Sequence, residues 1–444
     1  MTTSMLPPGW SRRSILKGGA ALGAGLVSAP LFSHAVFGQA SELTFWQFYA
    51  PDGQQPPSAI EWWNKMAADW NAQSETKIKL ENIVDYMSGN QLSTAFASGQ
   101  GPDLFLISPG DFLRYYNGGA LLDLTPFIDP EVQADFPEAV MGTRKVDGKI
   151  YGVPMEVEPM AFYYSVKAFE DAGLNENDVP KTWDELIEIG QKLTNADRYG
   201  VLFHTDPGYY QNFTWYPFMW QGGGEFQGAD GKSAFNSPGV VQALKLWKDT
   251  IDLGIAPRQV NGGGFDIVAN LGAGYCAMQN CGIWGISAMK QNAPDVPFGM
   301  FKLPIPNGGK YVTVGGGWAF VANANGKNTD MAGKFIAWAL ASKEADSIQR
   351  VVDWCTVAKS DMPPRQSAIE AGKAAYGQGE LKFFADEVYP GARGEPRLPP
   401  EAYKIISDAI QAAQLGGVEP AAAAETASAQ LDQFLATYKG APML

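Results

Sequence analysis

Residues that usually build metal sites and nucleophilic active sites are scarce in this sequence. Its 444 residues include 2 histidines and 3 cysteines (Cys276, Cys281 and Cys355), and no Cys-x-x-Cys motif occurs. Beyond residue 40 there is a single histidine, His204, so a zinc site or a serine–histidine hydrolase would depend on one imidazole. We interpret His204 as structural, and we predict neither a metal nor a cofactor.

Positive charge is also in short supply. Lys and Arg number 33 against 47 Asp and Glu, which gives a formal net charge of −14. This excess of negative charge disfavours nucleic acid and anionic membrane surfaces as partners. It suits a neutral or cationic small ligand better than an anion. The cysteines allow one disulfide in an oxidising compartment, and the sequence does not indicate which pair would form.

The first forty residues are typical of an export signal. Ser11–Lys17 (SRRSILK) resembles a twin-arginine motif, with Ile15 where Phe is commoner. The apolar stretch that follows, Gly18–Val27, is too short and too rich in glycine for a membrane anchor. Cleavage is expected after Ala40, with Ala35 as a second candidate. We therefore predict a twin-arginine signal peptide over residues 1–40 and a periplasmic protein that is not embedded in the membrane.

Strand-like and helix-like segments alternate after this leader. Residues 43–48, 78–83 and 103–108 are predicted strands, with amphipathic helices between them, a pattern that predicts an α/β lobe. The length of the chain favours two such lobes. Ligands of α/β lobes gather beyond the carboxyl ends of strands. Trp46, Tyr49 and Asp111 are therefore candidate ligand contacts.

Two carboxylates interrupt an apolar run at the centre of the chain. Glu156 and Glu158 stand between Pro154 and Pro159, and a carboxylate is costly to bury unless something pairs with it. We interpret Glu156 as a solvated residue at a strand edge and Glu158 as a candidate ligand contact.

The most aromatic stretch of the chain covers residues 209–224 (YYQNFTWYPFMWQGGG). Aromatic rings offer a ligand a large, rigid apolar face at low entropic cost. Two helical turns would present several of them, and some must pack into the core. We predict that Tyr209 or Phe213 packs in the core and that Trp215 and Trp220 face the ligand.

Several tracts resemble the maltose-binding-like family (solute-binding family 1), the extracellular solute-binding proteins of sugar ABC transporters. The matching tracts are YGVP and YYSVKAFEDAGL within residues 151–174, PKTWDEL at 180–186, GYCAMQNCGIW at 274–284, the glycine pairs at 308–309 and 315–316, and DMPPRQS at 361–367. Ser165 departs from the family's usual Asn. The order and spacing of these tracts cover nearly the whole chain beyond the leader.

The resemblance implies an α/β, two-lobed periplasmic binding protein fold of type II. Each lobe would be a sheet flanked by helices, and hinge segments would link the two. We expect residues 41–157 plus 303–354 in the first lobe and 158–302 plus 355–444 in the second. The chain would cross between lobes near Val157, Leu303 and Trp354.

The resemblance also implies site residues in the cleft between the lobes. Glu158 would face a sugar, Trp284 would stack on it, and Tyr403 would reach it. Trp318 would line the cleft or pack beneath it, and Arg365 would donate a hydrogen bond or form a hinge salt bridge. The complete set of candidate ligand-binding residues is Trp46, Tyr49, Asp111, Glu158, Trp215, Trp220, Trp284, Gly316, Trp318, Arg365 and Tyr403.

The function implied is that of the periplasmic substrate-binding component of an ABC importer. A monomer would bind a mono- or oligosaccharide, close about its hinge and deliver the sugar to the membrane permease. The alternatives are polyamine or polyol binding on the same fold, and an exported carbohydrate-active enzyme. Glycoside hydrolysis needs a pair of carboxylates flanking one bond, and no such pair is visible, so we predict a protein without enzyme activity. The sequence does not identify the sugar.

Overall fold

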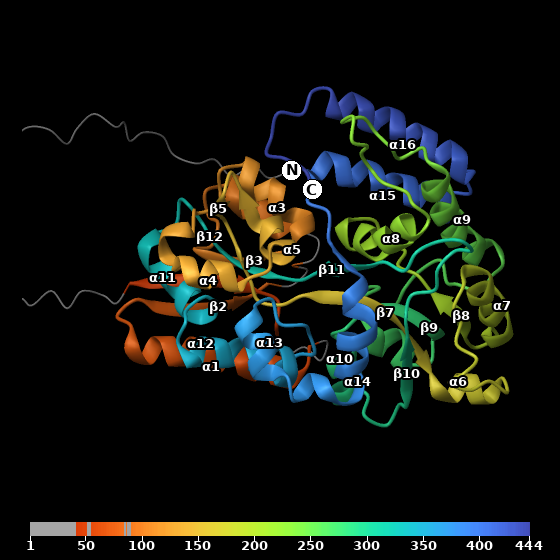
Figure 1. The fold of residues 1–444 in the computed structure, drawn as a ribbon, viewed down its shortest axis with the longest axis horizontal. Coiled ribbons are helices and arrows are strands. Elements are labelled where there is room, and N and C mark those ends of the chain that lie inside the picture. The colour runs from red at the N-terminus through yellow and green to blue at the C-terminus, as the bar shows by residue number, and fades with distance from the viewer. Residues whose placement is uncertain (1–40, 51–54, 84–85, 87–89) are drawn as a thin grey trace, which may run out of the picture. The chain divides into compact units, whose positions relative to one another are not determined.

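The chain folds around two β-sheets, and helices flank each of them (Figure 1). The computed structural model describes residues 41–50, 55–83, 86 and 90–444. The predicted signal peptide and its cleavage sites lie outside the described residues. No helix in the described part of the chain is both long and apolar enough to cross a membrane.

The first sheet has the strand order β2-β1-β3-β12-β6 and defines the first lobe. β1 pairs in parallel with β2 and β3, whereas β12 runs antiparallel to β3 and β6. Buried and less buried residues alternate along β1, which is the pattern of a strand with one face in the core. Its strands are β1 (Glu42–Gln47), β2 (Lys77–Asn82), β3 (Leu104–Ile107), β6 (Val153–Pro154) and β12 (Ala319–Ala322).

Helices flank this sheet and bury their apolar faces on it. Trp63, Met66 and Trp70 lie on the buried face of α1, at the spacing expected of an amphipathic helix. Trp63 stacks on Phe320 of β12. The helices are α1 (Pro57–Gln73), α2 (Asn90–Ala97), α3 (Pro109–Asn117), α4 (Pro130–Asp135), α11 (Thr329–Leu340), α12 (Ala345–Asp353) and α13 (Gln366–Gly372).

The second sheet has the order β13-β11-β7-β9-β8, with β10 also paired to β7, and defines the second lobe. β7 is buried along almost its whole length because it is central to the sheet. The strands are β7 (Glu158–Ser165), β8 (Tyr199–Leu202), β9 (Cys276–Gly282), β10 (Phe298–Phe301), β11 (Thr313–Gly316) and β13 (Ala392–Gly394).

Helices also flank the second sheet, and α15 packs against α8, α9 and α16. α7 begins with the capping box expected from the sequence, since Thr182 and Glu185 cap each other's backbone. The helices are α6 (Val166–Asp171), α7 (Trp183–Leu193), α8 (Tyr209–Gln221), α9 (Pro238–Asp252), α10 (Gly285–Asn292), α14 (Gly379–Phe383), α15 (Pro400–Gln414) and α16 (Pro420–Leu435). The short α5 (Glu138–Met141) contacts β6 and β13, and β4 (Lys145–Val146) pairs with β5 (Lys149–Ile150) as a separate hairpin.

The chain passes between the two sheets three times. The first crossing lies between β6 and β7, at residues 155–157. The second lies at 317–318, because β11 still pairs with β7 while β12 already pairs with β3; this is later than the expected Leu303. The third is an extended segment after Cys355. Along it, Ala368 of α13 still packs in the core of the first lobe, whereas Met362 and Tyr376 pack with the second.

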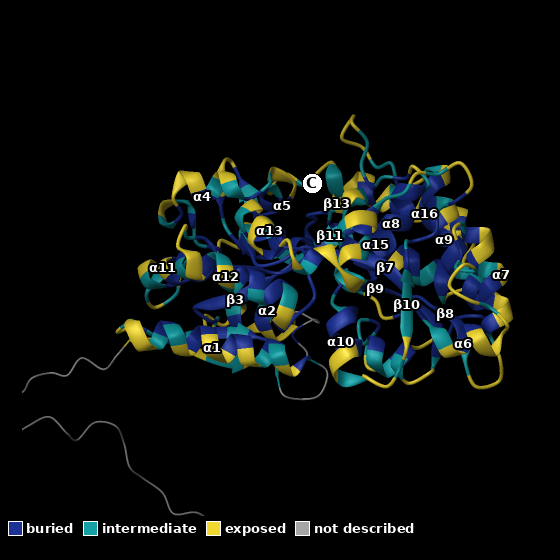
Figure 2. Cartoon of the chain, turned by 60° about the horizontal axis from the view of Figure 1, so that its bottom comes forward, coloured by how far each residue is buried: buried dark blue, intermediate teal, exposed yellow. Residues whose placement is uncertain are grey.

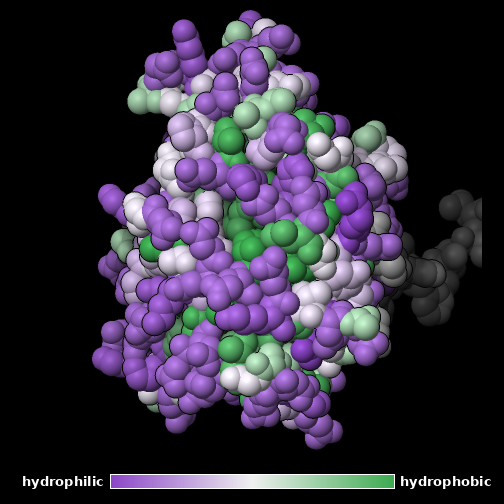
Figure 3. Space-filling view, turned by 90° about the vertical axis from the view of Figure 1, so that its right-hand side faces the viewer, coloured by the Kyte–Doolittle hydropathy of each residue, from purple (hydrophilic) through white to green (hydrophobic). Residues whose placement is uncertain are grey.

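Burial follows the two sheets, and the outer faces of the helices are exposed (Figure 2). The outer side of the second lobe is mostly hydrophilic, with a small hydrophobic area near its centre (Figure 3). Cys276, Cys281 and Cys355 are all buried and free. Among the described residues no cysteine therefore forms the disulfide that the sequence allowed.

Candidate functional site

A cavity opens where the two lobes and their crossings meet. The first lobe supplies Tyr49 and Ser108, just past the ends of β1 and β3, and the second supplies Trp284 at the start of α10. Its walls are predominantly aromatic. The aromatic residues that line it are Phe48, Tyr49, Tyr209, Tyr210, Phe213, Phe265, Trp284 and Trp318.

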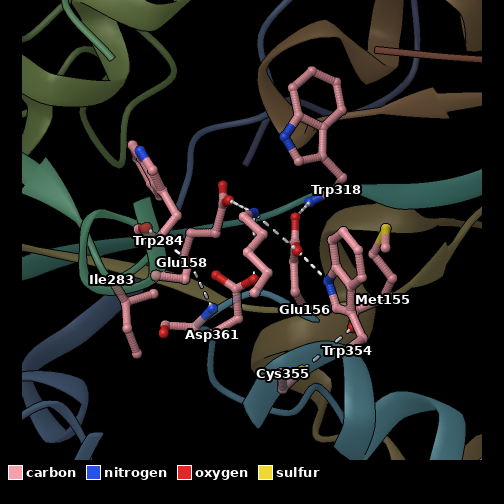
Figure 4. Close-up of polar contacts among 12 residues, drawn as sticks. Met155, Glu156, Glu158, Ile283, Trp284, Trp318, Trp354, Cys355 and Asp361 are labelled. Atoms are coloured by element: carbon pink, nitrogen blue, oxygen red, sulfur yellow. Dashed lines mark hydrogen bonds and ion pairs between the residues drawn. The ribbon is translucent and has the colours of Figure 1, made fainter. Parts of the chain in front are cut away.

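The aromatic wall is built from two groups of touching rings. In the second lobe, Tyr210 and Phe213 of α8 each lie with ring centroids 6.4 Å from that of Trp284. On the side of the first lobe, Phe48 lies 4.9 Å from Trp318. Trp284 and Trp318 stand on either side of a group of carboxylates (Figure 4). The cavity can therefore offer a flat ligand apolar faces from both lobes.

A buried ammonium group binds the carboxylates between these tryptophans. Lys359 Nζ lies 3.1 Å from Glu156 Oε2 and 3.3 Å from Asp361 Oδ2, and it makes a still closer contact with Glu158 Oε1. All four residues are at most 7 % exposed. We call Glu156, Glu158, Lys359 and Asp361 the crossing cluster.

The prediction for Glu156 is wrong, because this residue is completely buried and not solvated. Besides Lys359, its carboxylate accepts hydrogen bonds from the Trp318 backbone N–H at 3.1 Å and from Trp354 Nε1 at 2.6 Å. These donors and the ammonium compensate for the loss of water. Glu158 lies in the cavity wall, as its prediction as a ligand contact requires.

Electrostatics keep the Lys359 ammonium charged. Burial lowers the pKa of Lys359, but Asp361, Glu156 and Glu158 together raise it well above its ordinary value. Burial raises the pKa of Glu158 to about 7, with Glu156 adding to the rise and Lys359 opposing it. Burial and Glu156 also raise the pKa of Asp361 well above its ordinary value. Since three acids face one ammonium, we infer that the cluster retains a proton near neutral pH.

Oxygens of Glu156, Glu158 and Asp361 lie within 4.8 Å of one another, a spacing that would also suit a metal ion. The Lys359 ammonium already forms ion pairs with all three. A cation is thus part of the protein itself at this position.

The crossing cluster joins the three crossings between the lobes. Glu156 and Glu158 belong to the first crossing, Trp318 to the second, and Lys359 and Asp361 to the third. Because Glu158 and Lys359 also line the cavity, the segments that connect the lobes are in direct contact with the place a ligand would occupy.

A second carboxyl group, that of Glu395, reaches the cavity without an ion pair among the described residues. It is 3 % exposed and follows β13. A Cβ on Gly110 would lie 2.5 Å from its Oε1, and one on Gly316 would lie 3.0 Å from its Oε2, so both glycines make room for it. Burial raises the pKa of Glu395 to about 8, although Arg144 opposes the rise.

A smaller pocket adjoins the cavity, since Ser108, Tyr209 and Trp318 line both. It contains Asp111 of α3 and Tyr403 of α15, two of the candidate ligand contacts. Arg114 connects them, because its guanidinium pairs with Asp111 at 2.6 Å and donates to the Tyr403 hydroxyl. This contact joins the first lobe to the second.

The structure brings some of the candidate ligand contacts together and leaves others elsewhere. Those in the walls of the cavity or of the smaller pocket are Tyr49, Asp111, Glu158, Trp284, Trp318 and Tyr403. Those outside both walls are Trp46, Trp215, Trp220, Gly316 and Arg365. The ligand roles of the first group stay predictions.

The roles within α8 are the reverse of those expected. Trp215 is completely buried and packs on Phe235, and Trp220 is 6 % exposed and stacks on Tyr216. Phe213, predicted to pack in the core, lines the cavity together with Tyr209. The reason is that every residue of α8 from 211 to 221 is buried. The face of the helix toward the cavity therefore cannot be distinguished in the sequence by its hydrophobicity.

Trp46, Arg365 and Gly316 have other partners. Trp46 donates to Glu81 of β2 at 2.8 Å. Arg365 pairs with Asp135 at 2.6 Å and donates to backbone carbonyls at the end of α11 and just after it. This salt bridge lies within the first lobe and not at a hinge. Gly316 lies against the Glu395 carboxyl group and does not line the cavity itself.

Sequence reasoning missed several cavity residues. Lys359 and Glu395 lie in segments that match no tract of the family, and Ser108 and Tyr210 carry no pattern that sets them apart from neighbouring polar or aromatic residues. The hydroxyls of Tyr49, Ser108 and Tyr210 are buried and have no hydrogen-bond partner among the described residues. His204, interpreted as structural, is indeed buried outside the cavity wall, and burial lowers its pKa to about 3.

Two α/β lobes with three crossings and an aromatic cavity between them define a two-lobed ligand-binding protein. Residues 56–346 match the model of the bacterial extracellular solute-binding proteins, and this chain belongs to that family. The family resemblance seen in the sequence is thereby confirmed.

Relatives and solved structures agree with this assignment. The diacetylchitobiose binding protein DasA of Streptomyces coelicolor is 28% identical over 415 residues, which cover 89% of this chain and 90% of that protein. The arabinooligosaccharide-binding protein of Bacillus subtilis is 28% identical over 321 residues, 69% and 70% of the two chains.

An ABC transporter solute-binding protein of Thermotoga lettingae, solved with alpha-D-tagatose, superposes with a TM-score of 0.77 at 22% identity, over 89% of this chain and 100% of the other. The GacH receptor of Streptomyces glaucescens superposes with a TM-score of 0.74 at 20% identity, over 90% and 100%. The predicted type II binding-protein fold is confirmed.

Proposed function

We propose that this protein is the substrate-binding component of an ABC importer and that it binds a mono- or oligosaccharide in the cavity between its lobes. The observation that carries the proposal is the pairing of aromatic faces with buried polar groups. Trp284 and Trp318 stand on either side of the crossing cluster, and the hydroxyls of Tyr49, Ser108 and Tyr210 have no partner in the part of the chain that the structure describes. Sugar rings stack their C–H faces on aromatic rings and use such groups for their hydroxyls.

The names of the relatives support a carbohydrate ligand. They include proteins that bind arabinooligosaccharide, diacetylchitobiose and galactooligosaccharide, and a structural neighbour was solved with alpha-D-tagatose. All share the two-lobed architecture or most of the length of this chain.

The mechanism follows from the position of the cavity. A ligand contacts both lobes only when they are closed upon it, and this differential affinity shifts the population toward the closed form. The closed form docks on the membrane permease, and ATP hydrolysis on that complex drives uptake. We infer that the protein acts as a monomer in the periplasm after twin-arginine export of a chain whose residues 1–40 are the signal peptide.

The cavity suits binding better than catalysis. Glycoside hydrolysis requires one carboxyl group as acid and another as base or nucleophile. Glu158 is held by Lys359, which restricts its use in proton transfer. We therefore infer that the ligand leaves chemically unchanged.

Calorimetric titration of residues 41–444 with mono- and oligosaccharides tests the proposal. A cognate sugar should also stabilise the native protein by about 2.7 kcal/mol at a hundredfold excess over its dissociation constant, and this stabilisation raises the melting temperature. Trp284→Ala should weaken binding at least tenfold, or about 1.4 kcal/mol. Trp338→Ala, a half-buried tryptophan of α11 outside the cavity wall, is the matched control.

Two results would contradict the proposal. One is the absence of binding to any sugar of the panel. The other is the appearance of shorter glycans by chromatography after long incubation, which would identify an enzyme.

A further inference from the structure

We propose that the sugar carries a protonated amine and that Glu395 binds this nitrogen. The ligand is then a hydroxylated amine, such as an amino sugar. This inference rests on the proposed function and narrows its ligand class.

The charges of the cavity favour a cation. Among the residues that line it, Lys359 is the one basic side chain, against the acids Glu158, Asp266 and Glu395. Lys359 is already engaged by three carboxylates. Nothing in the lining is left to neutralise an anionic ligand, and the wall as a whole is negative.

Glu395 differs from the other buried acids in its partners. Glu156, Glu158 and Asp361 all pair with Lys359, whereas charged Glu395 is favoured by the charge of Arg144 and, to a smaller extent, by a hydrogen bond from the backbone N–H of Gly110. Arg144 forms no ion pair with Glu395 within the described part of the chain, and its guanidinium donates to the carbonyl oxygens of Gly317 and Val140. No described residue therefore forms an ion pair with the buried Glu395 carboxyl group. A cationic ligand could form that ion pair.

The surroundings of Glu395 also suit an ammonium group. A Cβ placed on Gly316 would meet Phe213 Cε2 at 2.5 Å and Glu395 Oε2 at 3.0 Å, so ring and carboxyl are neighbours. An aromatic ring beside a carboxylate is the usual environment in which proteins hold organic cations. The unpartnered hydroxyls of Tyr49, Ser108 and Tyr210 require hydroxyl groups on the same ligand, which a plain polyamine lacks.

Protonation should link binding to pH. The groups that act on Glu395 are Arg144, which favours its charged form, and Glu158, Asp111 and Tyr209, which oppose it. Burial raises its pKa to about 8, so an ammonium ligand must displace a proton below that pH. Affinity for an amine that stays charged should therefore increase as the pH rises toward 8.

Matched ligand pairs test the proposal on the chain of residues 41–444. Calorimetry compares D-glucosamine with D-glucose and N-acetyl-D-glucosamine, N-methyl-D-glucamine with D-glucitol, and includes spermidine as a cation without hydroxyls. We expect an amine to bind at least tenfold more tightly than its neutral counterpart. Glu395→Gln should weaken amine binding at least tenfold more than binding of the neutral partner, whereas the exposed Glu170→Gln should alter neither.

The outcomes separate this inference from the proposed function. Neutral sugars that bind as tightly as their amines overturn the inference and leave the sugar-binding function standing. Binding of spermidine alone overturns both, as does the absence of any binding. The comparison of ligands on the unmodified protein decides these cases even if Glu395→Gln does not fold.

Discussion

Two carboxyl groups in the wall of one cavity, Glu158 and Glu395, have opposite surroundings. Glu158 is held by the Lys359 ammonium and belongs to a cluster that joins all three crossings. Glu395 is also buried, accepts a hydrogen bond from the backbone N–H of Gly110, and forms no ion pair with any residue that the structure describes. A buried acid is thus satisfied within the protein where the chain supplies its cation, and it is available to a ligand where the chain does not.

The largest effect is expected from removing the cation of the crossing cluster. Lys359→Met leaves three buried carboxylates without their ammonium, and breaking a buried ion pair in this way costs about 3–5 kcal/mol. Urea unfolding should show this loss of unfolding free energy. The exposed Lys343, 3.9 Å from Asp129, is the control, and Lys343→Met should change stability by about 0.5 kcal/mol or less.

If Lys359→Met lowers the unfolding free energy by less than about 1 kcal/mol, the contrast between Glu158 and Glu395 does not hold. Such a result would mean that the three acids take up protons without penalty, so that the crossing cluster and Glu395 are equivalent.

An intermediate effect is expected from the pH dependence of Glu395. Its pKa of about 8 in the folded protein lies above the ordinary value of 4.5, so between these values the folded state binds more protons than the unfolded state. The stability of the ligand-free protein should therefore fall as pH rises from about 4.5 to 8 and level off above it. Glu395→Gln should flatten this fall and stabilise the protein on the order of 2 kcal/mol at pH 8.

Thermal unfolding from pH 5 to 9 measures this effect, with Glu170→Gln again as the exposed control. Other buried acids, including Glu158, contribute to the slope. An identical slope with and without Glu395 would show that this carboxyl is already satisfied within the protein.

The smallest effect is expected at Tyr403, in the pocket beside the cavity. Tyr403→Phe removes the hydrogen bond from Arg114, which joins α3 of the first lobe to α15 of the second. One such bond contributes about 0.5–1.5 kcal/mol. Because the bond requires the two lobes to be close together, its loss should weaken ligand affinity a few-fold, by calorimetry, more than it lowers the melting temperature. An unchanged affinity would exclude Arg114 and Tyr403 from the balance between open and closed forms.

The α/β class, the family and the cap of α7 could be predicted before the fold was known. These depend on local order: the capping box of Thr182 and Glu185, the alternation along β1, and tracts such as YGVP and GYCAMQNCGIW that keep their spacing. Such signals are readable because neighbouring residues decide them.

The partners of the buried groups could not be predicted, because they come from segments far apart in the sequence. Glu156 could not be interpreted correctly because Lys359 lies 203 residues further along the chain, and Arg365 meets Asp135 across a separation of 230. In α8, Trp215 and Phe213 are both buried, and only the packing of Phe235 and Trp284 against them places one in the core and the other at the cavity. Pairing and packing between distant segments leave no periodic trace in the sequence, so the charges and the rings of this cavity emerge only when the chain has folded.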